Sequence, residues 1–265
     1  MRRRHSIVFI ALVWAAFWLI LPERSLAASG QAGKSDLALV LAVDASASID
    51  EGEFKLQLNG IAKAFREPEV LEAIRSGQIG KIDVALLVWA EQGASTKGSR
   101  WFRIGSEAEA ERFAAHVESV PRRISGSTAV GNAIMSALVL LRDPSVLANR
   151  HCIDLSGDGR ETIVPHSRSR TTAPRLARAA AEDLHITINA LAIETEEKDL
   201  ARWYHRNIVT TNGFVAVVDA PEVFGNAIQR KLIKEIRGPA VAEIPAGIML
   251  PFHSSSSALE ARVSQ

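Results

Sequence analysis

Apolar and amphipathic stretches alternate along the chain between about residues 36 and 237. Continuous apolar runs are typical of strands buried on both faces, and they predict strands over residues 37–43, 82–89, 150–155, 186–193 and 214–218. Apolar residues at helical spacing predict helices between them, over residues 51–65, 68–76, 106–119, 129–142, 174–184, 197–205 and 221–236. The partly alternating residues 100–104 predict a short antiparallel strand at an edge.

Strands separated by helices predict a mostly parallel sheet with helices on both faces. The fold class is therefore α/β, with a doubly wound sheet of about six strands, one of them the antiparallel edge strand. One domain accounts for residues 36–237. Residues 238–265 lack apolar periodicity and include the run Ser254–Ser257, so we expect a flexible C-terminal tail there.

The first 27 residues have the pattern of a secretory signal peptide. Arg2, Arg3 and Arg4 precede an apolar run over residues 7–21, and Ser25 and Ala27 supply small residues before a cleavage point. The alternative is an uncleaved membrane anchor, but the run is shorter than the roughly 20 residues that a span needs. We expect a protein exported to the periplasm or cell exterior, with no membrane span after cleavage.

Composition narrows the classes of function. The 265 residues are 47% hydrophobic and 23% charged, as in ordinary folded domains. A net charge of +1 argues against a nucleic-acid partner. One cysteine, Cys152, excludes an internal disulfide and a cysteine-based zinc site.

Oxygen-bearing side chains follow two predicted strands and precede one predicted helix. Asp44, Ser46 and Ser48 follow the first strand, Thr128 precedes the helix that starts near residue 129, and Asp158 follows the strand ending near residue 155. Ligands in open α/β sheets bind beyond the carboxyl ends of the strands. Oxygen ligands select hard cations, so we expect a divalent cation here, Mg²⁺ first, with Mn²⁺ or Ca²⁺ possible.

The segment Asp44-Ala-Ser-Ala-Ser48 resembles the opening Asp-x-Ser-x-Ser motif of the von Willebrand factor type A (vWA) domain. The resemblance implies a metal-ion-dependent adhesion site (MIDAS), completed by Thr128 and by Asp158 in Ser156-Gly-Asp-Gly159. Within that group, residues 153–159 and 227–235 resemble a bacterial family of uncharacterised exported single-domain proteins.

Three positions near the motif need separate interpretation. Ala47 stands where the family often has glycine; small size is what the position needs. Asp154 lies within its strand, and we expect a buried carboxylate that braces the first loop rather than a metal ligand. Ser48 has an alternative role as a helix cap, with Glu51 three residues on.

The two carboxylates balance the charge of a divalent cation, and the three hydroxyls add no charge, so the net charge of the site is about zero. The cation then keeps an electrophilic coordination position that a further ligand can fill. The resemblance implies that an acidic side chain of a protein partner fills that position. The sequence shows no catalytic constellation, so we expect a binding module rather than an enzyme. Two alternatives remain: a metal-dependent hydrolase with Glu161 or His166 as general base, and an exported binder of a small anionic solute.

Overall fold

The computed structural model describes residues 33–91, 100–162, 172–220 and 224–238. The predicted signal peptide, residues 1–27, lies outside the described residues, as does the predicted tail except for Gly238. No helix in these described ranges is long and apolar enough to span a bilayer.

Six strands form one sheet in the order β3-β2-β1-β4-β5-β6. All neighbouring pairs are parallel except β2 and β3, which are antiparallel. The predicted fold class is thus confirmed, including the antiparallel edge strand. The strands are β1 (Ser35–Asp44), β2 (Ile82–Trp89), β3 (Phe102–Ile104), β4 (Ala148–Gly157), β5 (Thr187–Ile193) and β6 (Val215–Val218).

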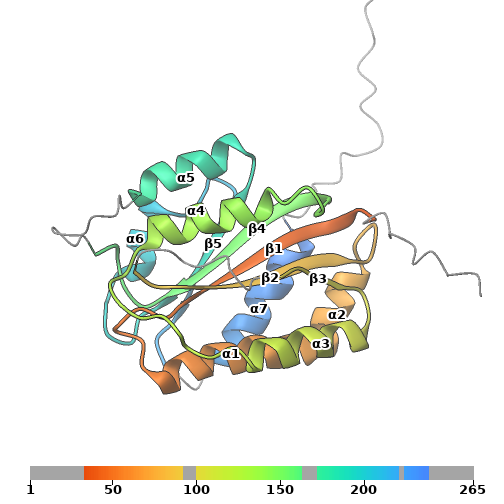
Figure 1. Cartoon of the computed structure of the whole chain (residues 1–265), viewed down its shortest axis with the longest axis horizontal. Helices are drawn as coiled ribbons and strands as arrows, with labels where there is room; N and C mark the ends of the chain where they lie inside the picture. The colour runs from red at the N-terminus through yellow and green to blue at the C-terminus, as the bar shows by residue number, and fades with distance from the viewer. Residues whose placement is uncertain (1–32, 92–99, 163–171, 221–223, 239–265) are drawn as a thin grey trace, which may run out of the picture.

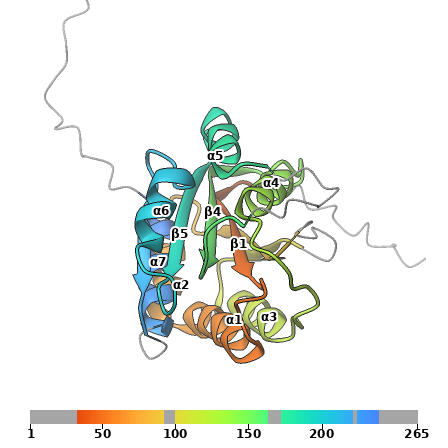
Figure 2. The same ribbon diagram turned by 90° about the vertical axis from the view of Figure 1, so that its left-hand side faces the viewer.

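Helices cover both faces of the sheet (Figure 1). One layer contains α1 (Glu51–Arg66), α2 (Pro68–Arg75), α3 (Glu107–Glu118) and α7 (Phe224–Arg237). The other contains α4 (Val130–Leu141), α5 (Pro174–Asp183) and α6 (Leu200–Asn207). The view turned by 90° also shows the sheet between α1 and α3 on one side and α4 and α5 on the other (Figure 2).

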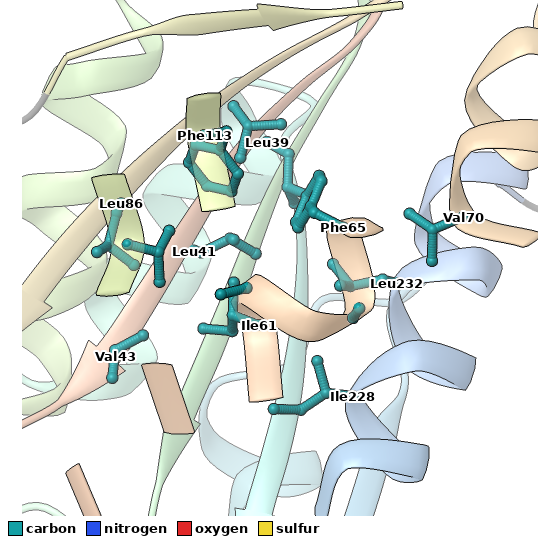
Figure 3. Packing of buried hydrophobic residues seen from close by; sticks show 14 of the residues in the cluster. Leu39, Leu41, Val43, Ile61, Phe65, Val70, Leu86, Phe113, Ile228 and Leu232 are labelled. Carbon is teal, nitrogen blue, oxygen red and sulfur yellow. The ribbon is translucent and has the colours of Figure 1, made fainter. Parts of the chain in front are cut away.

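The side chains of β1 alternate between two apolar cores. Leu39, Leu41 and Val43 pack in the core beneath α1, α3 and α7, where Ile61, Phe65 and Phe113 meet them (Figure 3). Val40 and its even-numbered neighbours face the core beneath α4, α5 and α6. Burial on both faces explains why this strand is apolar throughout. The strand ends at Asp44.

Several element boundaries differ from the sequence prediction, most clearly those of β4 and α6. Strand β4 runs from Ala148 to Gly157, about two residues longer at each end than the predicted 150–155. Helix α6 starts at Leu200 rather than at residue 197, because Asp199 has a left-handed backbone with φ of 61°, which a right-handed helix cannot include.

Candidate metal centre

Three loops meet at the carboxyl edge of the central strands. Asp44 is the last residue of β1, Asp158 follows β4, and Thr128 lies two residues before α4. The backbone N–H of Ala47 donates to the Gly126 carbonyl at 2.7 Å and joins the first loop to the loop before α4. Parallel pairing of β1 with β4 places their carboxyl ends at one edge, which is why residues 114 positions apart, Asp44 and Asp158, become neighbours.

Hydrogen bonds connect the first loop to Asp158. The Ser46 and Ser48 hydroxyl oxygens are 3.2 Å apart, and the Ser48 hydroxyl donates to Asp158 Oδ1 at 2.9 Å. Thr128 Oγ1 lies 3.7 Å from where a Cβ on Gly159 would stand, which puts this hydroxyl beside the Asp158 loop. The structure therefore gathers the side chains that the sequence singled out.

Asp44 is the most constrained of these groups. Its side chain is fully buried, and Oδ1 accepts the Ser46 N–H at 2.7 Å. Its other oxygen, Oδ2, is buried and has no hydrogen-bond partner among the described residues. Burial raises the pKa of Asp44 to about 7, and the nearby Asp158 carboxylate also raises it, against the lowering effect of the Ser46 N–H. A bound cation would satisfy this buried carboxylate oxygen and compensate its charge.

Asp158 shares this environment. It is 8% exposed, and burial raises the pKa of its carboxyl, while the Ser48 hydroxyl lowers it. Two carboxylates in a site sheltered from water disfavour each other's ionised form. Carboxylate and hydroxyl oxygens are the ligands that hard divalent cations prefer, so the chemistry of this cluster fits such a cation.

Glycine at position 157 is explained by close approach. A Cβ there would lie 2.6 Å from the Tyr204 hydroxyl and 2.8 Å from Asp44 Oδ2. The Tyr204 hydroxyl donates to the Gly159 carbonyl at 3.1 Å and so holds the Asp158 loop. Tyr204 and Asp44 thus occupy the space that a side chain at position 157 would need.

Two residues that the sequence analysis did not select hold the first loop in place. Gln57 of α1 donates to the Asp44 carbonyl at 3.4 Å and accepts from the Ser156 hydroxyl at 3.0 Å. Arg122 Nη2 donates to the carbonyls of Ala45 and Ser46 at 3.2 and 2.8 Å. Gln57 could have been noticed as a polar residue within the buried face of an amphipathic helix, whereas nothing in the local sequence singles out Arg122.

Asp154 does not have the bracing role that we expected. Its side chain lies on the α7 side of the sheet and forms an ion pair with Lys231. Side chains alternate along a strand, so Asp154 shares a face with Cys152 and Ser156. Gln57 and Ser156, rather than Asp154, connect this face to the first loop.

The alternative cap role for Ser48 is wrong. Asp50 caps α1: its side chain accepts the Glu53 N–H at 2.8 Å, and Glu53 Oε2 accepts the Asp50 N–H at 2.9 Å. The capping box thus starts two residues later than predicted, and it leaves the Ser48 hydroxyl to Asp158. Ala47 does not have a positive φ, so the loop does not require glycine there.

The residues considered for the hydrolase alternative lie as follows. Glu161 Oε2 accepts the Gly131 N–H at 3.0 Å at the start of α4, and its Oε1 is buried with no partner from the described ranges. His166 lies outside the described residues. Within the described part of the chain, no group of three or more His, Cys, Asp or Glu side chains could hold a metal ion, so a cation site depends on serine and threonine hydroxyls.

Solved structures with the same type of fold have little sequence identity to this chain. Proximal thread matrix protein 1 from the mussel byssus is 15% identical, with a TM-score of 0.52, and the match covers 76% of this chain and 46% of that protein. The pilus adhesin SpaC from Lactobacillus rhamnosus GG is 14% identical, with a TM-score of 0.52 and coverage of 76% and 31%. A von Willebrand factor type A structure from Catenulispora acidiphila is 17% identical, with a TM-score of 0.46 and coverage of 76% and 43%.

The chain thus spans less than half the length of each of these proteins. No curated protein matches it in sequence. The α/β fold, with its mostly parallel six-stranded sheet and one antiparallel edge strand, is of the same type as that of the byssus protein and the pilus adhesin. A family model described as "Protein of unknown function (DUF1194)" matches residues 34–240, and the chain therefore belongs to that family.

Proposed function

We propose that this protein is an exported, metal-dependent protein-binding module of the adhesion type. Asp44, Ser46, Ser48, Thr128 and Asp158 would hold a divalent cation, and an acidic side chain of a protein partner would complete its coordination. The observation that carries the proposal is Asp44 Oδ2, a buried carboxylate oxygen that has no partner in the described part of the chain. It lies beside hydroxyls from the same loop and a second carboxylate.

The charges of the site support an open position on the cation. Asp44 and Asp158 together balance a charge of +2, and the hydroxyls of Ser46, Ser48 and Thr128 add none. The cation, when bound, supplies an electrophilic centre that attracts an anionic oxygen. Mg²⁺ is the first choice, because it prefers oxygen ligands and a small number of carboxylates.

Export is part of the same proposal. The basic, apolar and small residues of positions 1–27 support a cleaved signal peptide.

The cation is tested by thermal unfolding with EDTA or with millimolar Mg²⁺ or Mn²⁺. A ligand that binds only the native state at 100 times its Kd stabilises it by about 2.7 kcal/mol, so Tm should rise by about 5–10 °C in a domain of this size. Asp44→Asn should abolish the rise and Thr128→Ala should reduce it.

Glu196→Gln is the matched control. Glu196 is exposed and lies close enough to raise the pKa of Asp158, so its removal changes the local charge without removing a proposed ligand. The cation proposal is wrong if no divalent ion shifts Tm in the wild type, or if Glu196→Gln and Asp44→Asn lose the shift equally.

Partner binding is tested by capture from an extract of exported proteins, in Mg²⁺ and in EDTA, with the wild type and Asp44→Asn as baits. We expect a protein retained by the wild type in Mg²⁺ and by neither bait in EDTA. Retention that is the same with both baits and in both buffers would contradict a metal-bridged contact.

A further inference from the structure

Thr128 reaches the candidate metal centre from a loop of its own. The Ser48 hydroxyl bonds directly to Asp158, and the Ser46 N–H bonds to Asp44. Thr128 belongs to neither of these loops: it lies two residues before α4 and is 6% exposed. The position of its side chain relative to the other proposed ligands therefore needs a separate explanation.

Thr162 supplies that explanation by pairing with both backbone groups of Thr128. The Thr128 N–H donates to Thr162 Oγ1 at 2.7 Å, and the Thr162 N–H donates to the Thr128 carbonyl at 2.9 Å. The Thr162 hydroxyl also donates to that carbonyl at 3.3 Å. Buried backbone N–H and C=O groups need partners, and for Thr128 both partners come from one residue. Thr162 therefore fixes the point from which the Thr128 side chain projects.

The segment that carries Thr162 also carries Asp158, four residues earlier. This segment is itself held in place, because the Tyr204 hydroxyl of α6 donates to the Gly159 carbonyl at 3.1 Å. Thr162 thus attaches Thr128 to a part of the chain that is already fixed. A proposed hydroxyl ligand and a proposed carboxylate ligand, which come from two different loops, thereby keep one spacing.

The residue before Thr162 holds the start of α4. The N-cap residue, Ala129, makes no capping bond with its side chain, and Glu161 Oε2 accepts the Gly131 N–H at 3.0 Å. A carboxylate is favourable there, because the N-terminus of a helix carries partial positive charge. Glu161 and Thr162 therefore attach the first turn of α4, and the loop residue just before it, to the Asp158 segment.

We propose that Thr162 is a positioning residue of the candidate metal centre and sets its preference for Mg²⁺ over Ca²⁺. This proposal rests on the proposed function, since it concerns the same cation site; Thr162 is not one of the proposed ligands and acts through Thr128. Mg²⁺ requires nearly ideal octahedral geometry with ligands at about 2.0–2.1 Å, whereas Ca²⁺ accepts about six to eight oxygens in flexible geometry. A Thr128 that is free to shift should therefore disfavour Mg²⁺ more than Ca²⁺.

Thr162→Val tests this role, because it removes the hydroxyl and keeps the shape of the side chain. The Thr128 N–H loses its acceptor, while the bond from the N–H of residue 162 to the Thr128 carbonyl remains. Calorimetric titration of the metal-free protein with MgCl2 and with CaCl2 measures the two affinities. We expect the Kd for Mg²⁺ to rise about fivefold or more and the Kd for Ca²⁺ to change by less than about twofold. Thr162→Ser keeps the hydroxyl and should hold the Kd for Mg²⁺ within about twofold of the wild type.

Thr210→Val is the matched control. Thr210 Oγ1 accepts the Ile188 N–H at 2.9 Å, a bond of the same kind at the amino end of β5, away from the carboxyl edge where the metal centre lies. Its loss should lower the Tm in EDTA, as the loss of a buried hydrogen bond does, and leave the affinity for both ions unchanged. Thermal unfolding in EDTA also shows whether each variant is folded. Thr162→Ala should show the same changes as Thr162→Val and replaces it if the valine variant does not fold.

Four results would overturn the positioning role of Thr162. They are unchanged Mg²⁺ affinity in Thr162→Val, an equal loss of Mg²⁺ and Ca²⁺ affinity in that variant, failure of Thr162→Ser to retain Mg²⁺ binding, and the same selective loss in Thr210→Val. Each of them leaves the proposed function standing, because the wild type still binds the cation. If the wild type binds no divalent cation, the proposed function fails and the role of Thr162 fails with it.

Discussion

The unusual ionisation of Asp44 should make the stability of the metal-free protein depend on pH. Its pKa is about 7 in the folded state, against 3.8 as the ordinary value. The native state therefore binds more protons than the unfolded state between about pH 4 and 7, and stability falls as pH rises through that range. A shift of about three pH units corresponds to at most about 4 kcal/mol.

Asp44→Asn should remove this dependence. In EDTA at pH 7.5 the variant should be more stable than the wild type in urea unfolding, and at pH 4.5 the difference should be about 3 kcal/mol smaller. Glu235 gives the same sign of pH dependence in both proteins, so the difference between them isolates Asp44. A variant that is less stable than the wild type at pH 7.5 would show that Asp44 is not an uncompensated charge.

Gly157→Ala should destabilise the fold by about 1–3 kcal/mol, as overpacking of a filled interior does. The added Cβ would stand 2.6 Å from the Tyr204 hydroxyl. Tyr204→Phe removes that oxygen, so the double variant should be more stable than the sum of the two single effects. Urea unfolding of the four proteins measures the coupling, and strict additivity would contradict the steric explanation.

At the scale of single elements, the start of α1 depends on Asp50 and not on the serines of the loop. Asp50→Ala removes the cap and should cost about 1 kcal/mol, with the Tm rise in Mg²⁺ unchanged because Asp50 is not a proposed ligand. Glu51→Ala is the control: Glu51 is exposed and pairs with Lys55 at 3.5 Å, so its loss should cost less than about 0.5 kcal/mol. Equal losses in the two variants would contradict the capping role.

Much of the secondary structure could be predicted from periodicity, because each central strand is buried on both faces and each helix buries one. The start of α6 could not, because the left-handed backbone of Asp199 leaves no mark in the apolar pattern. Asp44, Ser46, Ser48, Thr128 and Asp158 could be selected because strand ends are local features.

The supports of the site are different, because they depend on tertiary contacts. Gln57 reaches Asp44 from a helix, and Arg122 reaches the first loop from a segment more than 70 residues later. For the same reason, the prediction that Asp154 braces the first loop is wrong. Its partner is Lys231, which lies 77 residues further along the chain. A sequence pattern shows which residues are buried but not which residue across the interface they meet.

For the whole molecule, Lys231 connects the last helix to the centre of the sheet. Its ammonium lies between Asp154 of β4 and Glu235 of α7. Lys231→Met should cost about 3–5 kcal/mol, because it leaves the buried carboxyl groups of Asp154 and Glu235 without their shared ammonium partner. Urea unfolding measures the loss, and a stability equal to that of the wild type would contradict this role.

The two outermost strands, β3 and β6, have only three and four residues, whereas the central strands β1 and β4 have ten each. On β3, Arg103 makes a paired contact with the carboxylate of Asp83. A short edge strand that carries a charged pair offers few unpaired backbone groups to a strand of another molecule. Edge-to-edge pairing between the sheets of two copies is therefore disfavoured. We expect the protein to resist fibre formation at high concentration, even when no partner covers the edge strands.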